Sequence, residues 1–102
     1  SDGRINDTCT LDELASYVYF TETRTILDTK KINKTLLGTY NDAEYHLIFK
    51  GIGKNSLDRK FLVSLDRQKN KVIYADKCAL DDSTLEKYNT VFKQIPYEVK
   101  EF

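Results

Sequence analysis

The sequence predicts a mainly antiparallel β domain with one amphipathic helix near its C-terminus. Short segments in which apolar and polar residues alternate recur along the chain, with polar turns between them. Two of these segments, residues 60–65 and 72–75, have the pattern of a hairpin, and a helical stripe follows at residues 84–94. The alternative is an α+β fold, with helices on one face of an antiparallel sheet.

The first regular element is expected to be a strand over residues 16–27, after one helical turn at most. Thr10 and Glu13 have the spacing of a capping box, which favours a helix that begins near Leu11. From Tyr17 onward, however, aromatic and β-branched residues dominate, and threonines alternate with charged residues. Both features are typical of a pleated strand.

Two further strands are expected in the middle of the chain, at residues 36–40 and 44–50. Asn41 and Asp42 separate them, and both residue types tolerate the backbone angles of a tight turn. Residues 51–55 contain two glycines and break the second strand. Regular short strands with polar turns favour an antiparallel meander or a barrel.

The helix at residues 84–94 has clear end signals. Ser83 and Glu86 have the spacing of a second capping box, and Pro96 cannot continue a helix. A short final strand is expected after Pro96. Apolar residues spaced three and four apart form one stripe on this helix: Leu85, Tyr88, Val91, Phe92 and Ile95.

Length and charge limit the class of protein. The 102 residues fit one small domain, 1–102, in which residues 1–8 are expected to be loose. Basic and acidic residues balance at 16 each, which argues against nucleic acid as a partner because phosphate binding needs a basic excess. No apolar run approaches the roughly 20 residues of a membrane span, and the N-terminus lacks the apolar core of a signal peptide.

Cysteines and sequons bear on the compartment. Cys9 and Cys78 are either the two halves of a disulfide, as in an oxidising compartment, or two reduced thiols. Asn6 and Asn33 each begin an Asn-x-Thr triplet, the acceptor pattern for N-glycosylation. Together these features favour a secreted protein, or a periplasmic one if the source is bacterial.

His46 is the one histidine and the one candidate for acid–base catalysis near neutral pH. It is expected to be a satisfied strand residue or a residue that lines a pocket. An RNase-like enzyme would depend on His46 alone, so we expect no enzyme. Gly51-x-Gly53 lacks the strand-to-helix context of a phosphate loop, and no Cys/His cluster indicates a metal, so no cofactor is expected.

Several segments, taken in order, resemble the α1-acid glycoprotein type of the lipocalin family. Residues 74–77 and the helix before Pro96 resemble the end of such a protein. Residues 61–66 resemble its seventh strand, 45–49 an inner strand and 12–21 its second strand. The likeness covers about half of the chain, and the opening Gly-x-Trp strand of the family is missing because the chain has no tryptophan.

This resemblance implies a secreted glycoprotein that carries a small apolar ligand inside an up-and-down barrel, here in reduced form, without catalysis. Asn6 falls where the family carries a sequon. The alternative function is a small α+β protein–protein interaction module, such as a secreted or periplasmic inhibitor or immunity protein. A protein partner or a second chain could then complete the sheet. The ligand-binding residues that the resemblance implies are Val18, Phe20, His46, Val63, Leu65 and Tyr74.

Overall fold

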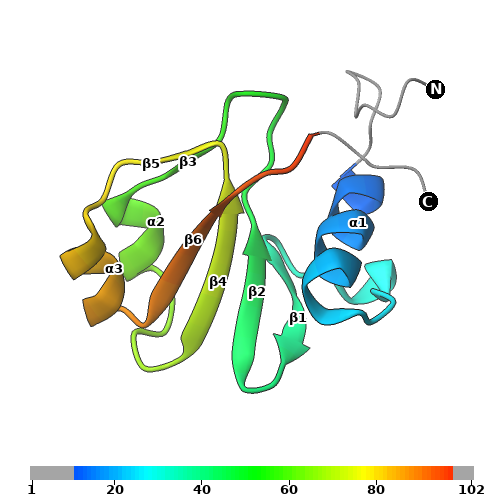
Figure 1. Ribbon diagram of the computed structural model, residues 1–102, viewed down its shortest axis with the longest axis horizontal. Helices are drawn as coiled ribbons and strands as arrows, with labels where there is room; N and C mark the ends of the chain where they lie inside the picture. The colour runs from blue at the N-terminus through cyan, green and yellow to red at the C-terminus, as the bar shows by residue number, and fades with distance from the viewer. Residues whose placement is uncertain (1–10, 98–102) are drawn as a thin grey trace.

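A four-stranded mixed sheet with helices on both faces forms the centre of the protein (Figure 1). The structure is a computed structural model and describes residues 11–97. The sheet order is β1-β2-β4-β6, and β3 and β5 form a separate two-stranded sheet. The elements are α1 (Leu11–Thr23), a 3-10 turn η1 (Thr29–Lys31), β1 (Leu36–Tyr40), β2 (Ala43–Leu47), β3 (Ser56–Leu57), α2 (Arg59–Val63), β4 (Asn70–Ala75), β5 (Lys77–Cys78), α3 (Asp82–Lys87) and β6 (Thr90–Gln94).

The predicted antiparallel β fold, whether meander or reduced barrel, is wrong. Within residues 11–97, β1 pairs antiparallel with β2, but β2, β4 and β6 run parallel. Parallel neighbours need a crossover connection, and the crossovers here contain α2 and α3. The α+β alternative is correct as a class, although the sheet is mixed and both of its faces carry helices.

α1 replaces the strand predicted at residues 16–27. A helix places residues four apart on one face, as with Leu14 and Val18 or Ala15 and Tyr19. All four side chains are therefore buried against the sheet. This burial outweighs the β propensity of the aromatic segment. Arg24 follows with a φ of 59°, and its left-handed backbone ends the helix.

The predicted hairpin is also wrong, and the predicted C-terminal helix is correct only in its first part. Residues 59–63 form α2, because the Asp58 carboxylate accepts a hydrogen bond from the backbone N–H of Phe61 and caps a helix. α3 ends early, at Lys87, and Asn89 adopts a φ of 52°. The next three residues, Thr90, Val91 and Phe92, are β-branched or aromatic and begin the parallel strand β6.

Local signals correctly predict the other part of the sheet. β1 has the predicted bounds, and β2 and β4 overlap the strands expected at residues 44–50 and 72–75. Asn41 and Asp42 join β1 to β2 with φ angles of 51° and 63°. Two successive positive φ angles are what the tight hairpin turn requires.

The core has two halves, one on each face of the sheet. α1 packs on one face with Leu37, Leu47 and Tyr74. On the other face, α2 and α3 pack through Leu62 and Leu85. Successive residues of β4 point to opposite faces, so both layers are filled by side chains, and the centre of the protein is solid rather than a cup.

Candidate functional site

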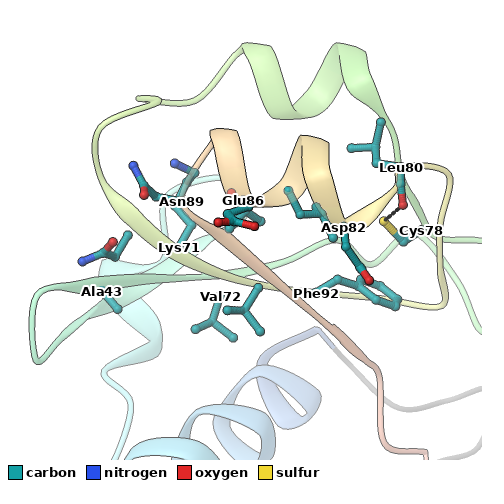
Figure 2. Close-up of a pocket in the computed structure, with 13 residues that line it drawn as sticks. Ala43, Lys71, Val72, Cys78, Leu80, Asp82, Glu86, Asn89 and Phe92 are labelled. Atoms are coloured by element: carbon teal, nitrogen blue, oxygen red, sulfur yellow. Dashed lines mark hydrogen bonds between the residues drawn. The ribbon is translucent and has the colours of Figure 1, made fainter.

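A groove of about 680 Å³ runs along β6 at the border of the sheet (Figure 2). We call it the β6 groove. On the α3 side of the sheet it is lined by Leu80, Leu85 and Phe92, and on the α1 side by Val72 and Val91. The groove therefore offers apolar side chains above and below one strand.

β6 is an edge strand whose outer side pairs with no strand among residues 11–97. The N–H of Lys71 bonds to the carbonyl of Asn89, and the N–H of Ile95 bonds to the carbonyl of Ala75. In a parallel pair, every second residue of a strand directs its N–H and C=O toward the partner strand. These two bonds show that in β6 these residues are Val91 and Lys93, which face β4. The alternate residues direct theirs away from the sheet, and we call them the outer-edge residues: Thr90, Phe92 and Gln94.

Apolar side chains remain exposed on both sides of this edge. Val91 is 53% exposed, because the core under α1 does not reach the outer strand. Phe92 is partly buried against the core under α3. A strand that paired with β6 would cover these side chains at the same time as it satisfied the outer-edge backbone groups.

The groove also carries carboxylates that lack a counter-charge. Asp82 and Glu86 are exposed, and Figure 2 shows both reaching from α3 toward β6. Neither forms an ion pair within residues 11–97. Lys71 also lines the groove, but its ammonium group donates to the carbonyls of Asp66 and Lys69, each at 2.6 Å.

Lys71 therefore does not neutralise these carboxylates. Its side chain is buried, and this burial lowers the pKa of Lys71. The two carbonyl groups that hold the ammonium belong to the loop between α2 and β4. Lys71 fastens this loop, and the open part of the groove is left with the two carboxylates of α3.

His46 lies between two hydrogen-bonding side chains, Thr35 and Glu44, on the α2 side of the sheet. Its Nδ1 lies 2.9 Å from the Thr35 hydroxyl, and its Nε2 lies 3.3 Å from a Glu44 oxygen. Burial lowers the pKa of His46, although Glu44 opposes this shift. In the neutral imidazole, Nε2–H donates to Glu44 and Nδ1 accepts from Thr35. Both ring nitrogens are therefore occupied by internal partners.

A second polar cluster ties α1 to the sheet. The Tyr74 hydroxyl donates to Glu22 at 2.5 Å, and Lys93 of β6 pairs with the same carboxylate. The hydrogen bond from Lys93 is the largest cause of the lowered pKa of Glu22, and the hydrogen bond from Tyr74 is the second. The pKa of Tyr74 is raised, mainly because its side chain is buried. This cluster holds the inner backbone of β6 in place, opposite its free edge.

A third polar cluster closes the carboxyl ends of the parallel strands. The buried Asn55 amide donates to the Gly51 carbonyl and to Asp76, each at 2.8 Å. The Tyr97 hydroxyl donates to the other oxygen of Asp76 at 2.6 Å. Every polar side chain of this cluster has an internal partner, so the cluster locks the loop after β2.

The structure does not bring together the ligand-binding residues that the resemblance implies. Val18 and Tyr74 lie in the core under α1, whereas His46 lies on the opposite face of the sheet. Leu65 packs against the core under α2. Phe20 and Val63 are exposed, at 46% and 51%. None of the six lines the β6 groove.

Cys78 lines the β6 groove and has no disulfide partner among residues 11–97; its sulfur lies 3.6 Å from the carbonyl oxygen of Leu80. Its expected partner, Cys9, and the sequon at Asn6 lie outside the described residues. Asn33 is exposed just before β1. The disulfide and the glycosylation sites stay predictions.

Sequence reasoning missed the β6 groove. Three of its lining residues, Leu85, Val91 and Phe92, belong to the stripe of the predicted helix, which in fact ends at Lys87. The pair of β-branched residues Thr90 and Val91, directly after Asn89, was the available signal for a strand. No local signal places this strand at the edge of the sheet.

Comparison of the chain with protein-family models, with curated proteins and with solved structures finds no match. Within residues 11–97, no helix has both the length and the apolar character needed to cross a membrane. No group of His, Cys, Asp and Glu in this part of the chain has the geometry of a metal site.

Proposed function

We propose that this chain is a non-catalytic protein–protein interaction module that binds an extended segment of another protein along β6. The observation that carries the proposal is the free outer side of β6, set in a groove with apolar side chains on both faces. An extended peptide that adds a strand to a sheet edge is a common mode of peptide recognition.

The backbone of the outer-edge residues would provide the first part of the affinity. Each of these three residues offers one N–H and one C=O to an added strand. A hydrogen bond of this kind contributes about 0.5–1.5 kcal/mol net. The ladder would be formed without regard to the partner's side chains, so specificity must come from the groove.

Side chains of the added strand would alternate between the two faces of the sheet. One set would lie on the α1 side against Val72 and Val91, and the other would lie near Leu80 and Phe92. Apolar burial contributes about 25 cal/mol per Å². The groove can therefore select for the pattern of a segment as well as for its extended shape.

The test compares two substitutions at one outer-edge residue. Gln94→Pro removes the outward N–H, and proline is tolerated at an edge position that does not donate to the sheet. Gln94→Ala is the matched control, because it removes the side chain and keeps the N–H. Peptides selected from a random displayed library on the wild-type chain are then titrated against all three proteins by fluorescence polarisation.

We expect the selected peptides to bind the wild type and Gln94→Ala with similar affinity and Gln94→Pro about tenfold more weakly, the effect of about 1.4 kcal/mol. Methylation of alternate backbone nitrogens in the peptide should weaken binding in the same way. Binding that is indifferent to both changes would overturn the proposal, provided that circular dichroism shows Gln94→Pro to be folded.

A small apolar ligand is the second candidate, because Leu80, Leu85 and Phe92 give the same groove an apolar wall. A medium-chain fatty acid separates the two. If it binds, and if binding is equal in Gln94→Pro and Gln94→Ala, the groove is a small-molecule site. An extended segment needs the outward N–H, whereas a fatty acid does not.

A further inference from the structure

On the basis of this proposed function, we infer that the bound segment alternates aliphatic and basic side chains. The aliphatic residues would face Val72 and Val91, and a lysine or arginine would face the carboxylates of Asp82 and Glu86. The inference names the chemistry of the partner, which the free edge alone does not define.

The two faces of the β6 groove differ in chemistry. On the α1 side, the lining is mainly aliphatic, with Ala43, Val72 and Val91 beside the polar Asn70 at the start of β4. On the α3 side, the apolar wall is bordered by Asp82 and Glu86 (Figure 2). Because neighbouring residues of a strand point to opposite faces, an added strand meets aliphatic and acidic surroundings in alternation.

The acidic border is unpaired and therefore available. Lys71, which also lines the groove, is held by two carbonyl groups and is buried. Lys93 projects on the α1 side and pairs with Glu22. Within residues 11–97, neither lysine forms an ion pair with Asp82 or Glu86, so a cationic side chain of the partner would meet no competing ammonium there.

The same charges argue against a second copy of this chain as the occupant. Phe92 is the middle one of the outer-edge residues. Two copies of β6 could therefore pair antiparallel about a two-fold axis that passes between their Phe92 residues. Such a pairing would place α3 of both copies on the same face of the joined sheet. The carboxylates of Asp82 and Glu86 would then lie on the same face as those of the second copy, and like charges gathered at an interface are costly.

The probes are two capped synthetic peptides that span the five residues of β6. One alternates valine with lysine, and the other alternates valine with glutamate. Both are titrated against wild-type protein, Gln94→Pro, and the double variant Asp82→Asn/Glu86→Gln. The double variant retains side-chain size and removes the charge.

We expect the valine–lysine peptide to bind the wild type about tenfold more tightly than the valine–glutamate peptide, which corresponds to two surface charge pairs. This preference should shrink in the double variant and in high salt, because exposed charges are screened. Gln94→Pro should weaken the binding of both peptides.

Three results would count against the inference and are distinguishable. Equal binding of both peptides, with loss in Gln94→Pro, overturns the partner chemistry and leaves the proposed function standing. Absence of binding, or binding unaffected by Gln94→Pro, overturns the proposed function itself. Sedimentation that shows a dimer of the wild type and a monomer of Gln94→Pro identifies a second copy as the occupant instead.

Discussion

The two edges of the sheet are finished in different ways. At the β1 edge, the N–H and C=O of Leu36 bond to Asn33 of the same chain, and the register shifts between Leu36 and Gly38. Such bulges and covering segments protect an edge from pairing with another chain. β6 has a regular five-residue register with β4, and its outer side pairs with no described strand.

This difference supports the proposal that another strand would be added at β6 and not at β1. A bare edge is a risk for aggregation, and the contrast with the covered β1 edge is one reason for our proposal that β6 receives a partner strand. The outer side of β1 is covered by its own preceding loop, whereas β6 has described strand contacts on its inner side only. The following predictions test this contrast, beginning with the largest effect.

Gly38→Ala should disturb the protected edge most. A Cβ at this position would lie 2.9 Å from the Tyr19 hydroxyl oxygen and 3.3 Å from the ring carbon that carries it. Tyr19 is buried and packs edge-on against Tyr45, so it cannot easily move. We expect a loss of about 1–3 kcal/mol in the free energy of unfolding.

Thermal denaturation measures this effect, and Thr39→Ala, at the next and exposed position of β1, is the control. The control should change stability by about 0.5 kcal/mol or less. If Gly38→Ala melts at the wild-type temperature, α1 does not pack on β1 as closely as described, and the contrast between the edges weakens.

Acidification should destabilise the β1–β2 side through His46. Burial lowers the pKa of His46 below its ordinary 6.5, whereas the unfolded chain retains the ordinary value. Between these two values the unfolded state binds more protons, so the free energy of unfolding falls as the pH falls below about 6.5. Glu44 and Lys71 are the charged groups that influence His46, and they act in opposite directions.

Urea denaturation between pH 5 and pH 7 measures this dependence, with His46→Gln as the non-titrating variant. The Glu22 carboxyl has a lowered pKa and contributes below its ordinary 4.5, outside this range. We expect a steeper loss of stability on acidification for the wild type than for His46→Gln. If the free energy of unfolding of the two proteins changed equally with pH, His46 would not be a buried, neutral imidazole in the folded protein.

Lys93→Met should loosen the inner attachment of β6 only slightly. Lys93 pairs with Glu22, but its side chain is 43% exposed. Exposed ion pairs contribute about 0.2–1 kcal/mol because water and salt screen them. A double-mutant cycle with Glu22→Gln isolates this coupling in low salt. A coupling above this range would show that the pair, rather than the strand ladder, holds β6.

Val91→Thr should have the smallest effect on stability, and a larger one on binding. The side chain is 53% exposed and the two residues have nearly the same shape, so unfolding should change by about 0.5 kcal/mol or less. An added strand would bury this side chain, so peptide binding should weaken several-fold. If binding were unchanged, the α1 side of the β6 groove would play no part in docking.

Local patterns predicted the part of the sheet that depends on local structure. The hairpin of β1 and β2 follows from alternation on either side of Asn41 and Asp42, and β4 follows from the apolar run at residues 72–75. The order of the strands could not be predicted, because β2, β4 and β6 are neighbours in the sheet but are separated in the sequence by long crossover connections. The β6 groove depends on this order.

Two errors have particular physical causes. The segment from Tyr17 to Thr23 favours a strand by composition, but burial of Val18 and Tyr19 on the sheet stabilises a helix. The stripe from Leu85 to Ile95 has helical spacing, but Asn89 interrupts it with a left-handed backbone. The predicted ligand residues came from the expectation of a cup, so they are spread over both faces of a solid sheet.

Residue-resolved amide hydrogen exchange of the free protein tests the central claim most directly. At a concentration where sedimentation shows a monomer, the amides of Phe92 and Gln94 should exchange at least about tenfold faster than those of Val91 and Lys93, which bond to β4. Equal protection of all four amides would contradict a free edge, and with it the proposal that β6 receives a partner strand.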